Sequence, residues 1–169
     1  MRLAALAAED QQFPEHVGFA WYGMLIAWQG NRMGEPLRVY STISQQLTKN
    51  LFLWPARTYF RKILEAILTL MLEVLWSKRR ILESYLNVVQ FGDKLFGIEA
   101  ASRHYFHKPA LDLTAAEASL LAVILPNPLQ LKIEAPTNWM LERQAEIRRG
   151  MDQVAARYPW IGRDCPSPR

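Results

Sequence analysis

Apolar residues recur with a helical period along most of this chain. In one stretch they lie three and four positions apart, at Phe60, Ile63, Leu64, Ile67, Leu68, Met71, Val74 and Leu75. This spacing predicts a helix of about five turns from about Thr58 to Trp76. The polar face of this helix carries Arg61, Lys62, Glu65, Thr69 and Glu73.

The same period and the capping residues predict further helices. They cover residues 3–8, a segment after the cap residue Ser77, and residues 99–106, 115–125 and 138–158. Thr114 and Glu117 form a capping box, and the helix that follows is apolar all round, which places it in the middle of a core. Gly92-Asp93 and Gly97 mark a loop, and no alternating strand pattern occurs. The fold class is therefore predicted to be all-α.

The apolar segment Phe19–Trp28 is rich in aromatic residues. It is too short to span a bilayer. One interpretation is a buried core helix. The other is a patch that contacts a membrane surface, because Trp and Tyr favour the membrane–water boundary.

The length of 169 residues fits one domain, which we place at residues 1–160, with a disordered tail at residues 161–169. The single cysteine, Cys165, cannot form an intramolecular disulfide and says little about the compartment. No run of about 18 apolar residues indicates a transmembrane helix. Because the first predicted helix begins so close to Met1, we expect a membrane anchor upstream of this stretch.

Positive charge is concentrated between residues 38 and 80. This segment holds eight Lys or Arg and two acidic residues, a net charge of +6, whereas the whole chain carries +4. Such a concentration favours a polyanionic ligand. A nucleic acid is disfavoured, because the aromatic residues and Arg are not interleaved as they are in stacking platforms.

Three groups of residues carry candidate chemistry. In the first, the acidic pair Glu9-Asp10 closes a short helix and is followed by Phe13 and His16. Catalytic groups are often held where the chain leaves regular structure. An acidic pair at a helix end is nevertheless more often a solvated surface, and a lone His is more often structural. No second His or Cys lies at the spacing of zinc ligands.

The second group runs from Ser41 to Asn50 and is rich in hydroxyl and amide side chains. These side chains can donate hydrogen bonds to phosphate or sugar oxygens. On a helix, one face would carry Thr42, Gln46, Lys49 and Asn50. A polar surface helix explains the same spacing equally well.

The third group is Arg61, Lys62 and Glu65, which can meet across one helical turn. A surface ion pair of this kind contributes only about 0.3–0.5 kcal/mol. The alternative is a carboxylate that orients cations, or a metal ion, for the neutralisation of a diphosphate.

Together these groups resemble the motifs of the peptidoglycan glycosyltransferases of glycosyltransferase family 51. The matches run in family order from about residue 4 to 130. They are Glu9-Asp10 with Phe13, His16 and Gly18; Ser41-Thr-Ile-Ser-Gln-Gln46 with Lys49-Asn50; Arg61-Lys62 with Glu65; Lys78 with Ile81-Leu-Glu-Ser-Tyr-Leu-Asn87; and Arg103-His-Tyr-Phe-His-Lys108. With no transpeptidase domain following, the chain is most similar to the monofunctional biosynthetic type.

The resemblance implies a lysozyme-like all-α fold and an enzyme that joins lipid II to a growing lipid-linked glycan chain. The reaction would invert the donor's anomeric carbon and release undecaprenyl diphosphate. Glu9 would be the catalytic base. Glu65 would be a second catalytic residue that orients cations or binds a divalent ion, Mg²⁺ or Mn²⁺, although no cofactor is required. The implied substrate-binding residues are Asp10, Phe13, His16, Ser41, Thr42, Gln46, Lys49, Asn50, Arg57, Arg61 and Lys62.

The resemblance also implies a place at the cell inner membrane, with the catalytic domain facing the periplasm. Phe19–Trp28 would contact the membrane surface, and partners would come from cell-division or cell-wall synthesis proteins. Lys78, Tyr85 and Asn87 would support the fold near the site.

One departure from the family pattern concerns Val39-Tyr40, which replace a Gly followed by Gly or Ala. Glycine permits unusual dihedrals and close ligand approach, so a turn or the clearance for substrate is expected to differ.

Two alternatives to a glycosyltransferase remain. One is a lysozyme-like hydrolase that attacks with water. The other is a catalytically weakened, membrane-associated scaffold of cell-wall synthesis, against which the intact Glu9, Lys49 and Glu65 argue.

Overall fold

The computed structural model describes residues 1–20, 41–54 and 58–161. Four predictions fall outside these ranges: the aromatic segment from residue 21 onward, the Val39-Tyr40 departure, the role of Arg57, and the tail beyond residue 161. The elements are α1 (Arg2–Glu9), α3 (Ile43–Phe52), α4 (Tyr59–Leu75), α5 (Lys78–Val88), β1 (Gln90–Gly92), β2 (Leu95–Phe96), α6 (Ile98–Phe106), η1 (Ala110–Asp112), α7 (Ala115–Ile124) and α8 (Asn138–Arg157).

This element order confirms the all-α fold class, with one local correction. The loop predicted around Gly92-Asp93 is a small antiparallel hairpin, in which Gln90 pairs with Phe96 and Gly92 with Leu95. Strands of three and two residues are too short to produce an alternating sequence pattern, so the sequence pattern contains no sign of this hairpin.

Hydroxyl side chains cap the starts of α3, α4, α5, α7 and α8. Ser77 accepts a hydrogen bond from the backbone N–H of Arg80, and Thr114 forms the predicted capping box with Glu117. Such caps satisfy backbone donors that have no partner inside the helix. The predicted starts of α5 and α7 are therefore confirmed.

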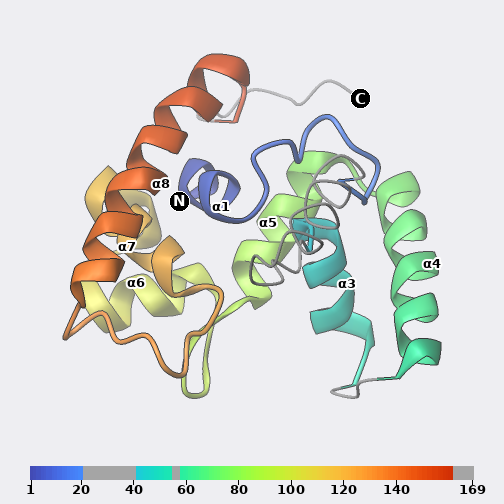
Figure 1. The fold of residues 1–169 in the computed structure, drawn as a ribbon, viewed down its shortest axis with the longest axis horizontal. Coiled ribbons are helices and arrows are strands. Elements are labelled where there is room, and N and C mark those ends of the chain that lie inside the picture. The colour runs from blue at the N-terminus through green and yellow to red at the C-terminus, as the bar shows by residue number, and fades with distance from the viewer. Residues whose placement is uncertain (21–40, 55–57, 162–169) are drawn as a thin grey trace, which may run out of the picture.

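The core extends from the packing of α1, α7 and α8 to that of α3 and α5. Figure 1 shows α6, α7 and α8 on one side of the molecule, α3 and α4 on the other, and α1 and α5 between them. As predicted, the apolar helix α7 packs into the core, and its buried residues include Leu121 and Ile124. A Cβ at Gly150 of α8 would lie only 3.1 Å from the Cβ of Ala7, so glycine permits the close approach of α8 to α1.

Helix α4 turns its polar face toward the protein. Its buried residues are Glu65, Thr69 and Leu72, whereas Val74 and Leu75 are 81% and 72% exposed. An amphipathic helix of a globular protein ordinarily buries its apolar face. We use the name apolar face of α4 for its exposed residues Tyr59, Phe60, Ile63, Ile67, Leu70, Met71, Val74 and Leu75.

Polar contacts to α3 explain this orientation of α4. The hydroxyl of Thr69 lies 3.3 Å from that of Thr48 and donates to the Glu65 carbonyl oxygen at 2.7 Å. Ser44 donates a hydrogen bond to Glu73. Within the described part of the chain, no helix is both long and apolar enough to cross a membrane.

Candidate active site

Glu9 is the last residue of α1, and Asp10 is its C-cap. The Glu9 side chain reaches a cavity of about 570 Å³ between α1, α3, α7 and α8. The cavity is lined by Ala8, Glu9, Ser41, Gln46, Ala122, Val123, Pro126, Trp139, Arg143 and Glu146. The structure thus gathers three predicted site residues, Glu9, Ser41 and Gln46, around one space.

The charge state of Glu9 is set by opposing influences. Burial is the largest and raises the pKa of Glu9 above its ordinary value of 4.5. A hydrogen bond from Gln46 and the positive charge of Arg143 lower this pKa; Asp10 raises it and Lys49 lowers it. Burial disfavours the ionised carboxylate, whereas a donor and nearby cations favour it. A carboxylate of this kind is a stronger base than an exposed Glu.

Gln46 is held in place from both ends of its amide. Its Nε2 donates to Oε2 of Glu9 at 2.6 Å and to the Ser41 carbonyl oxygen at 3.3 Å. The hydroxyl of Tyr85, a fully buried residue of α5, donates to Oε1 of Gln46 at 3.1 Å. These contacts fix the amide orientation, so that the N–H group faces Glu9. Tyr85 thereby supports the site, as the motif resemblance implied.

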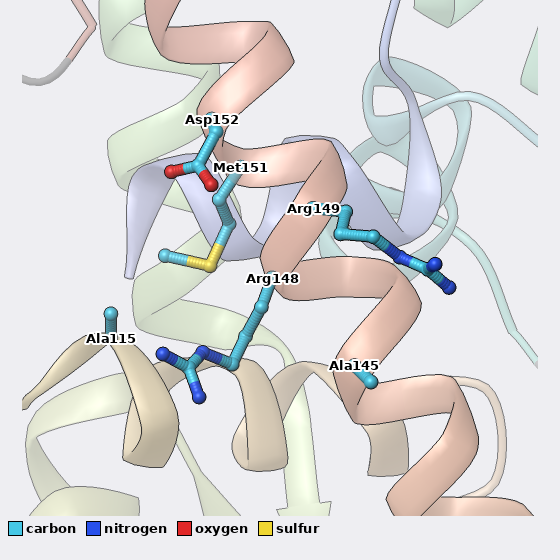
Figure 2. Close-up of a pocket in the computed structure, with 6 residues that line it drawn as sticks. All are labelled: Ala115, Ala145, Arg148, Arg149, Met151 and Asp152. Carbon is cyan, nitrogen blue, oxygen red and sulfur yellow. The ribbon is translucent and has the colours of Figure 1, made fainter.

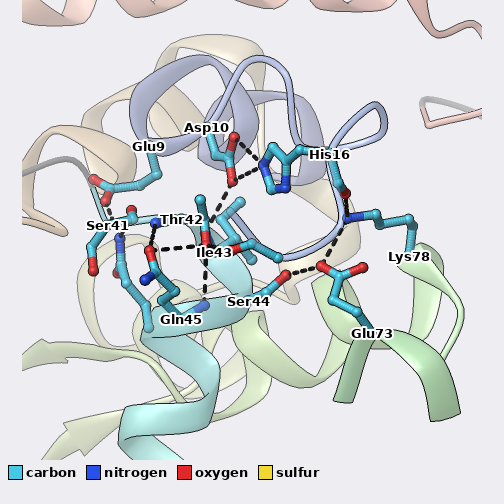
Figure 3. Close-up of polar contacts among 12 residues, drawn as sticks. Glu9, Asp10, His16, Ser41, Thr42, Ile43, Ser44, Gln45, Glu73 and Lys78 are labelled. Carbon is cyan, nitrogen blue, oxygen red and sulfur yellow. Dashed lines mark hydrogen bonds and ion pairs between the residues drawn. The ribbon is translucent and has the colours of Figure 1, made fainter. Parts of the chain in front are cut away.

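Asp10 and His16 bind each other instead of facing the cavity. Nε2 of His16 lies 3.0 Å from both carboxylate oxygens of Asp10, and Oδ2 of Asp10 accepts a hydrogen bond from the Ile43 N–H at 3.1 Å. Figure 3 shows this pair beside the start of α3. Asp10 therefore attaches the loop after α1 to the N-terminus of α3, where a negative charge is also favourable.

Three side chains predicted to bind substrate are enclosed by protein in this structure. Phe13 is fully buried in the core, and Asp10 is 6% exposed. Thr42 is 3% exposed, and its hydroxyl caps α3 and donates to the Gly18 carbonyl oxygen at 2.6 Å. Because α3 begins at Ile43, Thr42 is the cap and not part of the polar helix face. The sequence pattern could not distinguish a ligand-binding hydroxyl from a capping one.

A buried ion pair that the sequence reasoning missed lies behind this loop (Figure 3). Lys78 contacts Glu73 at 2.8 Å and also donates to the carbonyl oxygen of His16. Ser44 donates to the same Glu73 oxygen. Burial lowers the pKa of Lys78, whereas the hydrogen bond to Glu73 opposes this effect. The pair joins α3, α4 and α5 to the loop that follows Glu9.

Gly18 permits the tight approach of this loop to α4. Its φ is +76°, and a Cβ there would lie 2.7 Å from Cγ2 of Thr69. A residue with a side chain would be strained in this conformation. Steric crowding against Thr69 therefore explains why the first motif has a glycine at position 18.

Glu65 forms a second charged group on α4. It is 2% exposed; its Oε2 pairs with Arg61 at 2.8 Å and its Oε1 pairs with Lys62. The predicted meeting of these three side chains is confirmed. Both carboxylate oxygens are thus engaged by cations. No group of three His, Cys, Asp or Glu that could hold a metal comes together in the described residues, and the binding of Mg²⁺ or Mn²⁺ at Glu65 stays a prediction.

The remaining predicted ligands do not line the cavity. Lys49 and Asn50 are exposed near the end of α3, and Arg61 and Lys62 lie at the start of α4. Lys49 still acts on Glu9 through its charge. The basic group therefore lies along α3 and α4 and does not line the cavity.

Helix α8 contributes three cavity residues that the sequence reasoning missed, Trp139, Arg143 and Glu146. The guanidinium of Arg143 reaches the Ala8 carbonyl oxygen at 3.3 Å, across 135 residues of chain. In sequence these residues belong to an ordinary amphipathic helix. No local signal connects them to Glu9.

A second cavity, of about 430 Å³, lies between α8 and the start of α7. Figure 2 shows Arg148 and Met151 directed toward the side on which Ala115 lies, whereas Arg149 points to the other side of α8. None of the predicted site residues lines it. The Glu9 cavity is therefore the candidate active site.

Comparison with known proteins identifies the family of the chain. Residues 1–152 match the model of the transglycosylase family. The biosynthetic peptidoglycan transglycosylase of Pasteurella multocida (strain Pm70) is 52% identical over 158 residues, which is 94% of this chain and 64% of that protein. Proteins of the same name from Escherichia coli O1:K1 / APEC and Shigella dysenteriae serotype 1 (strain Sd197) are each 55% identical over 155 residues, covering 91% of this chain.

The chain spans 64% of the length of these curated relatives. The aligned part holds the whole Glu9 cavity, from Ala8 to Glu146, within the residues that match the family model. This chain therefore belongs to the transglycosylase family.

Proposed function

We propose that this chain is the catalytic domain of a peptidoglycan glycosyltransferase that polymerises lipid II. One observation carries the proposal: Glu9 is a half-buried carboxylate, fixed by Gln46, at the wall of a 570 Å³ cavity. The relatives named as biosynthetic peptidoglycan transglycosylases support it. The order of the motifs supports the same substrate class.

In the proposed reaction, the 4-hydroxyl oxygen of the lipid II acceptor attacks the anomeric carbon of the lipid-linked glycan donor. A new carbon–oxygen bond forms, and the bond to undecaprenyl diphosphate breaks with its electron pair on the phosphate oxygen. The anomeric configuration inverts. The hydroxyl proton passes to Glu9, whose pKa is raised by burial toward the range of an effective general base.

The leaving diphosphate gains negative charge, which preorganised cations stabilise. The exposed Lys49 on α3 and the Arg61–Lys62 pair on α4 are the candidates among the described residues. Glu65 touches both members of that pair. We assign to Glu65 the positioning of these cations, with no proton transfer of its own.

Membrane contact is part of the proposal, at the inner membrane with the domain facing the periplasm. A lipid-linked substrate keeps its tail in the bilayer while its sugars react. The apolar face of α4 offers a matching surface, because Ile63, Ile67 and Met71 are each at least half exposed. Transfer of apolar side chains from water into lipid lowers the free energy. This face adds to the membrane contact expected of the aromatic segment.

The test uses the purified chain with fluorescent lipid II in phospholipid vesicles. We expect polymeric glycan to form with wild-type protein and to be lost with Glu9→Gln. A parallel incubation contains finished, lipid-free glycan. Cleavage of that glycan without consumption of lipid II would replace the proposal by a hydrolase.

Binding of lipid II without either reaction would instead support a catalytically weakened scaffold. The relatives bear the names of transglycosylases, so the comparisons give that alternative no support. For localisation, protease cleavage of the domain in spheroplasts but not in intact cells is the expected result.

A further inference from the structure

Helix α8 supplies one wall of the Glu9 cavity, although it lies at the far end of the chain from α1. Trp139, Arg143 and Glu146 follow one another at intervals of four and three residues. Residues at this spacing share one face of a helix. None of them belongs to the motifs that identify the family resemblance. The motifs therefore do not account for the presence of these three side chains in the cavity.

Arg143 uses its guanidinium at two points. Nη2 donates to the Ala8 carbonyl oxygen at 3.3 Å, and Nη1 pairs with Oε2 of Glu146 at 2.8 Å. Ala8 immediately precedes Glu9 in the last turn of α1. The carbonyl groups of a last turn have no partner inside the helix and favour nearby cations. Arg143 thus binds the part of the backbone that carries the candidate base.

The end of α1 is closed by side chains, without the glycine cap that ends many helices. Gln11 donates to the Ala7 carbonyl oxygen at 3.2 Å, and Arg143 occupies the next carbonyl, that of Ala8. Packing around these bonds is tight, because Gly150 of α8 faces Ala7. A change at Arg143 therefore acts on the direction in which Glu9 leaves the helix.

Charged side chains near Glu9 come from α3, from α8 and from the end of α1. Asp10 lies beside it at the end of α1 and raises its pKa, and Lys49 of α3 lowers it. Tyr85 of α5 contacts Glu9 through Gln46 and also interacts with its charge, and α7 contributes the uncharged Ala122 and Val123.

On α8, Arg143 and Glu146 both line the cavity. Arg143 lowers the pKa of Glu9, while Glu146 is engaged by Arg143 and so is the counter-charge of that cation. Of the described cations, Arg143 is the one placed in the cavity wall itself.

We propose that Arg143 is a positioning residue for Glu9: it holds the last turn of α1 and places a positive charge in the wall of the cavity that Glu9 lines. The consequence for catalysis rests on the proposed glycosyltransferase function. The positioning itself does not, since it concerns only α1, α8 and the protonation of Glu9.

A titration tests the inference without any substrate. Glutamate is labelled with ¹³C at the side-chain carboxyl, and the Glu9 signal is assigned by its loss in Glu9→Gln. In Arg143→Met the Glu9 pKa is expected to rise, because a cation that favours the carboxylate is gone. Arg143→Lys retains the charge and is expected to restore most of the wild-type value.

The matched control is Arg148→Met, which removes a cation from the same helix at the second cavity. It is expected to leave the Glu9 titration unchanged. Should Arg143→Met fail to fold, Arg143→Gln takes its place, since Gln retains a donor for the Ala8 carbonyl. An unchanged Glu9 pKa in a folded, uncharged Arg143 variant overturns the inference.

A second measurement separates the two proposals. With lipid II as substrate, the acidic limb of the kcat/KM profile is expected to move to higher pH in Arg143→Met and to return in Arg143→Lys. If wild-type protein polymerises lipid II and this limb does not move, the Arg143 inference fails alone. If wild-type protein is inactive but the NMR shift occurs, the function fails and the inference stands.

Discussion

The amide of Gln46 donates a hydrogen bond to the carboxylate of Glu9 at 2.6 Å, and this bond joins the start of α3 to the end of α1. The bond favours the ionised form of a carboxylate that burial disfavours. The second motif thus acts on the first through a contact that determines how basic the candidate catalytic residue is.

Replacement of Gln46 by Leu should raise the pKa of Glu9, because the carboxylate loses its hydrogen-bond donor while burial persists. The acidic limb of the pH–rate profile for lipid II polymerisation should then move to higher pH. Activity at acidic pH should fall more than activity at alkaline pH. Equal loss at all pH values would show that Gln46 acts only through packing.

Tyr85→Phe is the matched variant for this prediction. It removes the hydroxyl that donates to Gln46 but leaves the Gln46–Glu9 bond in place. The acidic limb of the pH–rate profile is expected to shift in the same direction as in Gln46→Leu, but by a smaller amount. A larger shift than that of Gln46→Leu would contradict the order of contacts seen here.

Much of the helical structure could be predicted from sequence, because periodicity and capping are local properties. The capping box at Thr114 and the helix that ends at Glu9 are examples. The orientation of α4 could not be predicted in this way. Periodicity defines two faces of a helix, but the partners on α3 decide which face is buried.

Seven of the ten residues that line the Glu9 cavity also lie beyond sequence reasoning. Gln46 belongs to a recognisable motif, whereas Arg143 reaches α1 from 135 residues away. Asp10 and Phe13 are a different case, because their motif positions predicted substrate contact and both are buried. Their burial shows that a motif can record the construction of a site as well as its contact with substrate.

The Glu73–Lys78 pair should be a strong determinant of stability. The Glu73 side chain is 3% exposed and that of Lys78 is 18% exposed. Removal of one partner leaves a buried charge unpaired, which costs about 3–5 kcal/mol of unfolding free energy. We expect a loss of this order in Glu73→Gln, measured by urea denaturation.

A double-mutant cycle distinguishes the pair from its surroundings. Lys78→Met should destabilise the protein in the same direction, and Glu73→Gln combined with Lys78→Met should lose less than the sum of the single variants. Strict additivity would mean that the two residues stabilise the fold independently, for example through Ser44 and the His16 carbonyl.

The apolar face of α4 should bind lipid. Ile67 and Val74 are 50% and 81% exposed, so replacing both with Ser should change folding stability little. Burial of one such side chain is worth about 1.5–3 kcal/mol, and the double variant should bind vesicles at least about tenfold more weakly. Co-sedimentation with phospholipid vesicles measures this.

Leu111→Ser provides the control for α4, because Leu111 is 96% exposed but lies on η1, away from that face. Its vesicle binding should match that of wild-type protein. Equal binding by the α4 variant and wild-type protein would remove the apolar face of α4 from the membrane proposal.

The acid stability of the α6–α7 region should depend on Glu117. A hydrogen bond from Lys108 is the largest influence, and together with those from Thr114 it lowers the pKa of Glu117 from 4.5 to about 2. A carboxyl with a lowered pKa stabilises the folded state above its unfolded pKa and loses this effect as the pH falls through its folded value. Wild-type protein should therefore be more stable than Glu117→Gln above about pH 4.5, and the difference should disappear toward pH 2.

Thermal unfolding at several pH values measures the Glu117 effect. Gln can still complete the capping box, so the comparison isolates the charge. In a Lys108→Met background the pH-dependent difference should shrink. A difference that persists unchanged below pH 2 would assign the effect to packing.

Glu9→Gln should lower the polymerisation activity and raise the stability of the folded protein at neutral pH. Loss of the base should lower lipid II polymerisation by a factor on the order of 10² or more, with lipid II binding largely retained.

Because the folded pKa of Glu9 is raised, the ionised carboxylate is less favourable in the folded protein than in the unfolded chain. This penalty in folding free energy grows as the pH rises through the folded pKa. Glu9→Gln should therefore be more stable than wild-type protein at neutral pH, with the advantage vanishing below about pH 4.5, the ordinary value for Glu. Urea denaturation at neutral and acidic pH, beside the polymerisation assay, gives both quantities. Near-normal polymerisation by Glu9→Gln would exclude Glu9 as the base, and a variant that is less stable at neutral pH would show that the Glu9 carboxylate supports the fold.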